Sequence, residues 1–310
     1  MISYWQTISN GLLPIQSFKK NCIVNITSPS EDEKDILKST FQIPEDIILD
    51  IMDVDERSRL EFENDKIIII LRIPIQATEN GIPFSTIPLG IIISDDYTLI
   101  LCQRESIAIS EFFNQRKRKA VEYKNKFDFI LNLFLHTTNI YHRYLRQINF
   151  QANMVEKDLE KSTKNEELHK LLKLEKCLVY FTTSLRSNKF LFARIKASRF
   201  IESSMYSEEL LEDVMIENKQ AIEMANIYSD IQSGMMDAFA SVISNNLNIV
   251  MKQLTIVTII LAIPTMIASF YGMNVPNYFE NTHFAFWSII AFSIIIASIG
   301  IVMIRKRRWI

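Results

Sequence analysis

The sequence predicts an α+β membrane protein with an N-terminal α/β domain, a long helical region and a two-helix transmembrane hairpin. Three observations predict this class. Short Ile-rich runs alternate with helical patterns over residues 1–105. No Gly occurs between Gly90 and Gly234, which permits long uninterrupted helices. Near the C-terminal end, two runs without a charge, 254–273 and 284–304, are each long enough to cross a bilayer.

The first region, 1–105, is predicted to be a compact α/β domain. Two helices are expected between its strands: Ser30 and Glu33 form a capping-box pattern, and Pro44 is followed by Glu45 and Asp46. Four runs are typical of strands because they are rich in apolar residues and bounded by Pro, Gly, Asn or Asp: 22–26, 66–73, 89–94 and 98–102.

Helices follow without interruption. Within 106–198, residues 116–162 and 166–196 are expected to form an amphipathic helical hairpin with a polar turn between them. A third helix is predicted to start near Ser207 and to continue through a stalk, 199–253, into the first transmembrane run as far as Tyr271. Such a helix has about 65 residues and is ~100 Å long.

The charges that flank the two apolar runs predict their orientation. The connecting loop, 274–283, has no Lys or Arg, whereas the tail, 305–310, begins with four consecutive basic residues. By the positive-inside rule the tail is cytoplasmic, and a hairpin returns the chain to the side that it left. We therefore expect a multi-pass protein of the cell membrane, in contact with the lipid bilayer, whose N- and C-termini are both cytoplasmic.

Composition excludes several function classes. The six glycines form neither of the two common phosphate-binding motifs, so no nucleotide cofactor is expected. The 34 Lys and Arg against 36 Asp and Glu argue against nucleic acid as a partner. The three Cys and four His lack the spacing of a zinc site. We find no nucleophile, base and orienting residue in a recognisable pattern, and therefore expect no enzyme activity.

A polar stripe runs along the long helix. Alternating steps of four and three residues define it, and eight of its ten positions are polar. Small-residue packing between helices would explain hydroxyls inside the apolar run, but not the continuation of the stripe to Asn248 and Asp237 outside it. A water-filled path surrounded by several copies of the chain explains both. The ten positions are Asp237, Ser241, Ser244, Asn248, Met251, Thr255, Thr258, Ala262, Thr265 and Ser269.

Two further patterns concern the stalk and the second apolar run. A neighbouring, mostly apolar stripe is expected to pack helix against helix. In the second run, Ser288, Ser293 and Ser298 step by five and are scattered around the helix, which favours an outer helix facing lipid. The positions of the apolar stripe are Ala221, Met224, Tyr228, Ile231, Met235, Ala238 and Val242.

The first run ends in Tyr271-Gly272-Met273-Asn274, where Gly272 permits a turn that other residues resist and Asn274 offers an amide oxygen. Here the chain resembles the CorA family of divalent metal ion transporters, whose hallmark is Gly-Met-Asn after the first of two C-terminal spans. The similarity also includes residues 248–255, the Ile-Pro-Thr of 263–265 and the basic tail, and the order of domains fits over the whole chain.

The resemblance implies a funnel-shaped homopentameric channel for Mg2+, often admitting Co2+ or Ni2+, with the stalk helices lining the pore. It assigns Asn274 to the ion-selectivity filter, shaped by Gly272 and Met273. Asp237 and Asn248 match polar pore positions. The resemblance assigns Met251 and Leu254 to a hydrophobic constriction that closes by dewetting.

Uptake would be driven by the membrane potential, since two charges gain ~4.6 kcal/mol at 100 mV inside negative. A ring of neutral amides can hold hydrated Mg2+ through its waters without removing them. The resemblance also gives Mg2+ a regulatory role, with Asp213 as one ligand between cytoplasmic domains. Glu79, Asp95 and Asp96 are its candidate partners. Ala240 and Ala262 depart from bulkier residues of relatives, so the number of gates stays open.

Two other functions remain open at this point. One is a Zn2+ transporter on the same scaffold, because related proteins with similar filter motifs carry zinc. The other is a membrane-anchored scaffold or signalling protein whose hairpin only tethers the α/β domain. That second function predicts no ion flux and leaves the polar stripe without a purpose.

Overall fold

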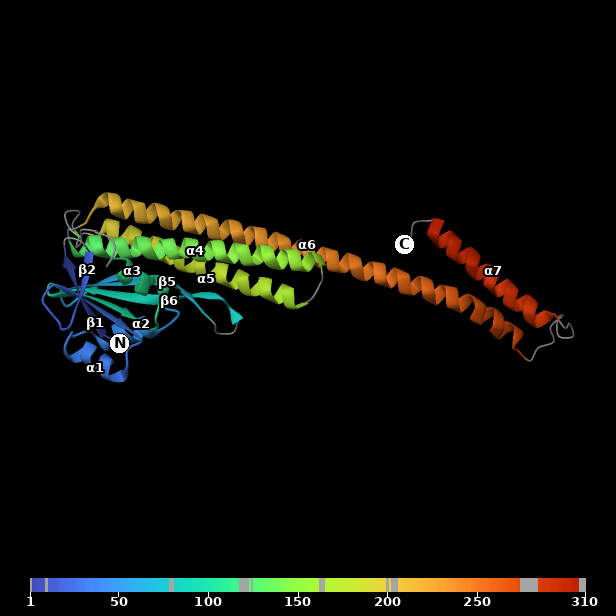
Figure 1. Cartoon of the computed structure of the whole chain (residues 1–310), viewed down its shortest axis with the longest axis horizontal. Coiled ribbons are helices and arrows are strands. Elements are labelled where there is room, and N and C mark those ends of the chain that lie inside the picture. The colour runs from blue at the N-terminus through green and yellow to red at the C-terminus, as the bar shows by residue number, and fades with distance from the viewer. Residues whose placement is uncertain are drawn as a thin grey trace. The chain divides into compact units, whose positions relative to one another are not determined.

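The computed structural model describes residues 2–8, 11–77, 81–116, 123, 125–161, 165–198, 201, 206–273 and 284–306. The chain divides into two compact units, Met1–Met236 and Asp237–Ile310, which we describe separately. Figure 1 shows the elements of both units.

The first unit contains a seven-stranded sheet with the order β2-β1-β3-β7-β6-β5-β4. β3 and β7 pair in parallel, and the other neighbours pair antiparallel. The strands are β1 (Ile2–Ile8), β2 (Gly11–Ile15), β3 (Cys22–Thr27), β4 (Arg59–Glu63), β5 (Lys66–Gln76), β6 (Phe84–Ile93) and β7 (Tyr97–Cys102).

The four predicted strands correspond to β3, β5, β6 and β7, which lie in the middle of the sheet. β1, β2 and β4 were not predicted from the sequence. Two of these, β2 and β4, are the edges of the sheet. Edge strands need less apolar surface, and β2 carries Pro14, which an edge tolerates because no neighbour needs its missing N–H.

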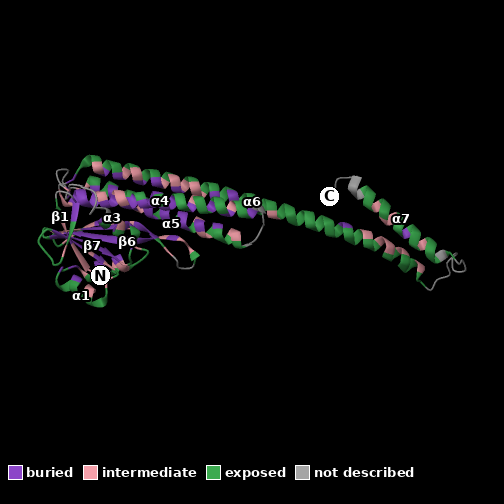
Figure 2. Ribbon diagram, viewed as in Figure 1, coloured by how far each residue is buried: buried purple, intermediate pink, exposed green. Residues whose placement is uncertain are grey.

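Helices cover both faces of the sheet, which explains why its central strands are continuous apolar runs. Successive side chains of a strand point to opposite faces. Ile68 and Ile70 of β5 therefore belong to one core, with residues of α1 (Glu31–Ser39) and α2 (Glu45–Met52). Ile69 and Leu71 belong to the other core, with residues of the later helices. Figure 2 shows the buried interior of this unit.

Local signals specify the two helices of the first face. The capping box of α1 is confirmed: the Ser30 hydroxyl accepts from Glu33 N at 3.3 Å, and Ser30 N donates to the Glu33 carboxylate at 3.0 Å. Gly90 of β6 lets α2 approach the sheet closely. A Cβ at Gly90 would lie 2.2 Å from Ile51 Cδ1, so any larger residue would displace α2.

The second face carries α3 (Ile107–Arg116), α4 (Lys126–Lys161) and α5 (Asn165–Ala197). The predicted helical hairpin is confirmed as α4 and α5, but its expected start at residue 116 is wrong. Arg116 ends a separate helix, and α4 begins at Lys126. α3 packs Phe112 and Phe113 against the sheet core, so it is a distinct packing element and not the first turns of α4.

A single helix, α6 (Glu208–Tyr271), spans 64 residues and takes part in both units. The predicted helix from near Ser207 to Tyr271 is therefore confirmed. Its N-terminal half is fastened to the first unit by hydrogen bonds: Asn218 Nδ2 donates to the Leu185 carbonyl at 3.0 Å, and the Gln232 amide donates to the Leu171 carbonyl. The second unit adds α7 (Ala285–Lys306).

Arg72 on β5 joins the layers of the first unit. Its guanidinium donates to the carbonyl oxygens of Val54 and Glu56 at 2.6 and 2.7 Å. It also donates to Thr86 Oγ1 at 2.7 Å and to Ser184 Oγ of α5 at 3.0 Å. Burial lowers the pKa of this guanidinium, but the oxygens that surround it satisfy its donors. Arg72 thus ties the sheet to α5.

We expect Arg72→Met to lower the free energy of unfolding by at least about 3 kcal/mol, because several buried acceptors lose a charged donor. Chemical unfolding of the purified full chain, followed by circular dichroism, measures the change. The matched control is Arg57→Met, which removes an exposed guanidinium and should change stability by less than about 0.5 kcal/mol. Equal effects of the two substitutions would contradict the role of Arg72.

Candidate functional site

The burial of α6 changes along its length. In the first unit one face is buried at alternating steps of three and four residues, as expected for a helix packed on α4 and α5. Within the single chain the predicted apolar stripe is buried only in part: Ala221 and Met235 are buried, whereas Ile231, Ala238 and Val242 are exposed, and packing between copies stays a prediction. The buried face instead includes Leu211, Val214, Asn218, Ala221, Ala225, Gln232 and Met235.

The whole polar stripe is exposed. All ten positions from Asp237 to Ser269 are open to the surroundings of the chain, including Met251 and Ala262, its two apolar members. Figure 2 shows this exposed part of α6. Leu254 lies next to this face and is also exposed, so an apolar patch of Met251 and Leu254 follows Asn248 along the helix.

The hydroxyls of the stripe have a defined orientation. Thr255, Thr258 and Thr265 each donate to the carbonyl oxygen four residues earlier at 2.8 Å. Ser241 does the same to the Asp237 carbonyl at 3.1 Å. Because the hydroxyl proton points back to the helix, the oxygen lone pairs remain free on the exposed side. The stripe therefore presents acceptors, which suit a cation or the water molecules around it.

Away from the stripe, α6 has a less exposed face within the second unit. Ile256 is buried there, and Ile260, Ile263 and Ile267 are half-buried at helical spacing. The less exposed residues of α7 also share one face: Ile289, Ser293, Ile296, Ala297 and Gly300. The small residues on this face of α7 permit close approach of another helix, which is typical of packed membrane helices.

The three serines of α7 are scattered around the helix, as predicted. Ser293 is only 7% exposed and does not face the surroundings, whereas Ser288 and Ser298 do. A small hydroxyl residue on the packed face permits close helix approach, which spacing within a single helix does not reveal. Both helices are long and apolar enough to cross a membrane.

The end of α6 carries part of the predicted filter. Gly272 N donates to the Ala268 carbonyl at 2.9 Å, and Met273 is exposed. The φ of Gly272 lies outside the left-handed region, so the backbone angle is not what disfavours other residues at this turn. Instead, an added Cβ would lie 3.3 Å from the Ala268 oxygen, a tight contact. Asn274 lies outside the described residues.

Asp213, the predicted regulatory ligand, is exposed on α6 between the buried Leu211 and Val214. Within the described part of the single chain, no three His, Cys, Asp or Glu side chains are placed to hold a metal ion. Of its candidate partners, Asp96 pairs with Lys20 at 2.8 Å, Asp95 is exposed, and Glu79 lies outside the described residues.

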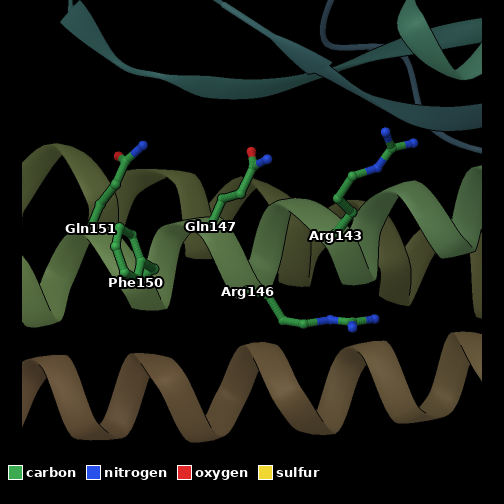
Figure 3. Close-up of a pocket in the computed structure, with 5 residues that line it drawn as sticks. All are labelled: Arg143, Arg146, Gln147, Phe150 and Gln151. Atoms are coloured by element: carbon green, nitrogen blue, oxygen red, sulfur yellow. The ribbon is translucent and has the colours of Figure 1, made fainter.

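A surface depression on α4 offers no alternative active site. Arg143, Arg146, Gln147, Phe150 and Gln151 line it, all from one helix. Figure 3 shows Arg143, Gln147 and Gln151 pointing to one side of the helix and Arg146 to the other. The Arg143 guanidinium is held by the Glu111 carboxylate at 2.6 and 2.9 Å. These side chains include no nucleophile and no general base.

Comparisons with known proteins agree with one another. A family profile described as "CorA-like Mg2+ transporter protein" matches residues 18–306. The chain is 28% identical over 263 residues to the cobalt/magnesium transport protein CorA of Methanocaldococcus jannaschii, covering 84% of this chain and 82% of that protein. It is 24% identical over 312 residues to the protein of the same name from Thermotoga maritima, covering 97% and 86%.

A solved structure matches the whole fold. It is the complete structure of the CorA magnesium transporter from Methanocaldococcus jannaschii, with a TM-score of 0.82 and 25% sequence identity. The match covers 100% of this chain and 99% of that chain. The predicted order of α/β domain, long helix and C-terminal apolar hairpin is thus confirmed.

If the stripe faces water inside a membrane, a cysteine on it will ionise and react, whereas one facing lipid will not. We expect Thr258→Cys to react with a charged methanethiosulfonate reagent at least about tenfold faster than Ile259→Cys, its exposed neighbour off the stripe. The measurement is labelling of the full chain in proteoliposomes, followed by mass spectrometry.

The native thiols give little background in this experiment. Cys22, Cys102 and Cys177 are buried, and burial raises their pKa, to about 12 for Cys102 and about 11 for Cys177. They therefore stay protonated at neutral pH. Equal labelling rates at positions 258 and 259 would mean that the stripe does not line a water-filled path.

Proposed function

The chain belongs to the CorA-like Mg2+ transporter family, and we propose that it forms a pentameric channel for Mg2+ uptake across the cell membrane. Members of this family are divalent cation transporters and not enzymes. For this chain we propose Mg2+ as the main ion, with Co2+ or Ni2+ also admitted. Both curated relatives are named for cobalt and magnesium transport, which supports this choice.

The observation that supports a channel best is the continuous exposed polar stripe of α6. A hydroxyl facing hydrocarbon would leave its free acceptors without partners, which costs free energy. Several copies arranged around an axis would instead turn these faces toward shared water. Ile227, Ile231 and Val242, which are about half exposed on α6, would be covered by neighbouring copies in such an assembly.

The chemistry of the stripe suits a hydrated divalent cation. Mg2+ loses its waters reluctantly, so a path that binds it through those waters avoids the cost of dehydration. Hydroxyl oxygens with their protons turned inward accept hydrogen bonds from these waters. We assign Asn274 to the filter at the outer mouth, and Met251 and Leu254 to a constriction that closes when it loses water.

We propose that cytoplasmic Mg2+ regulates the channel. Asp213 is exposed on the part of α6 that is fastened to the first unit, so an ion bound there acts on the helix that also carries the stripe. Mg2+ bridging Asp213 and carboxylates of an adjacent copy would hold the helices closed, and its loss would free them. The membrane potential supplies the driving force for uptake.

Asn274→Ala should lower Mg2+ uptake by about tenfold or more, because each copy loses one hydrogen-bonding amide and the effect adds over the ring. Uptake into liposomes that contain the purified protein, followed with an internal Mg2+ indicator, measures it. Ser288→Ala on the exposed side of α7 is the control and should retain uptake. Uptake of Zn2+ without Mg2+ would favour the zinc transporter, and no flux of either would favour the scaffold.

Asp213→Ala should weaken inhibition by internal Mg2+, raising the half-inhibitory concentration at least about fivefold. Uptake is measured in liposomes preloaded with a series of Mg2+ concentrations. Asp230→Ala removes an exposed carboxylate from the same helix and should not change the half-inhibitory Mg2+ concentration. An unchanged curve for Asp213→Ala would reject the regulatory role and leave the transport function intact.

A further inference from the structure

A basic pocket lies between α5 and α6 in the first unit. Lys189, Phe192 and Lys196 line it from α5, where the spacing of three and four residues places them on one helix face. Glu212, Asn218 and Lys219 line it from α6. The three ammonium groups and one carboxylate leave an excess of two positive charges. Phe192 is buried and gives the pocket an apolar wall.

The lysines of this pocket are available for a ligand. All three are exposed on the surface of the unit. The nearest charge to Lys219 Nζ that the structure records is Glu223 Oε1 at 3.8 Å, a distance too long for a hydrogen bond. Three cations around a small pocket repel one another, so an anion placed among them would lower the free energy of the folded chain.

Asn218 gives a second, independent indication of a ligand. Its side chain is 1% exposed, and its Nδ2 donates to the Leu185 carbonyl at 3.0 Å. Its Oδ1 is buried and has no hydrogen-bond partner among the described residues. A buried acceptor without a donor costs free energy, so a ligand that carries a hydroxyl would satisfy it.

We propose that this pocket binds a small organic phosphate monoester that carries a hydroxyl group. Such a group has a charge of about −2 at neutral pH, which matches the excess positive charge of the pocket. The phosphate would lie among Lys189, Lys196 and Lys219, and the hydroxyl would donate to Asn218 Oδ1. The carbon skeleton would contact the apolar wall at Phe192.

The position of the pocket suggests a regulatory role for the ligand. Lys189 and Lys196 belong to α5, and Lys219 belongs to α6, the helix that carries the polar stripe. A bound phosphate would therefore join the two helices. It would also neutralise positive charge close to Glu212 and its neighbour Asp213. This consequence for Asp213 rests on the proposed function, but the binding itself does not.

The test is isothermal titration calorimetry of the purified full chain with glucose 6-phosphate, in Mg2+-free buffer of low ionic strength. We expect a Kd of about 1 mM or tighter. The double variant Lys189→Gln and Lys196→Gln should weaken binding about tenfold or more. The control, Lys157→Gln with Lys176→Gln, removes the same charge from exposed positions outside the pocket and should bind as the unmodified chain does.

Three results would overturn the proposal. They are no heat of binding with the unmodified chain, equal losses in the two double variants, or inorganic phosphate binding as tightly as glucose 6-phosphate. The last would mean that neither the hydroxyl nor the carbon skeleton is recognised. Because no ion flux is measured, the result is independent of whether the chain transports Mg2+.

Discussion

The absence of water inside a bilayer is the constraint on which this structure depends. A span in hydrocarbon must satisfy its backbone within the helix and must hide its polar side chains. The first span of this chain has polar side chains on one face, and the single chain leaves every one of them exposed. We propose that copies of the chain arranged around an axis turn these faces toward a shared water-filled path.

The same constraint explains the second span. The partly covered face of α7 includes three small residues, Ser293, Ala297 and Gly300, together with Ile289 and Ile296. Small residues let two helices approach closely, which favours packing by dispersion forces when lipid is as apolar as the protein. In the proposed channel, α6 would present acceptors to the water-filled path and α7 would present apolar side chains to lipid.

In the first unit water is available, and different forces dominate. Burial of Ile-rich strands between two helical layers supplies most of the stabilisation. Arg72 is a partly buried polar group of this unit whose donors are satisfied by surrounding oxygens. The threonine hydroxyls of the stripe donate to carbonyl oxygens of their own helix. In the first unit, Asn218 Oδ1 is buried beside the basic pocket and accepts no hydrogen bond from the described residues.

Local patterns in the sequence determined much of this protein. The length of an uncharged run predicts a span, the 3.5-residue repeat places the stripe on one face, and the Ser30 and Glu33 pair starts a helix, because each depends on neighbouring residues alone. Only the tertiary structure decided the edge strands β2 and β4, the buried face of α6, the covering of Ser293 and the partners of Arg72. These depend on contacts between distant residues, such as Arg72 and Ser184, which are 112 positions apart. The spacing of residues within one segment does not show which of its faces a distant segment will pack against.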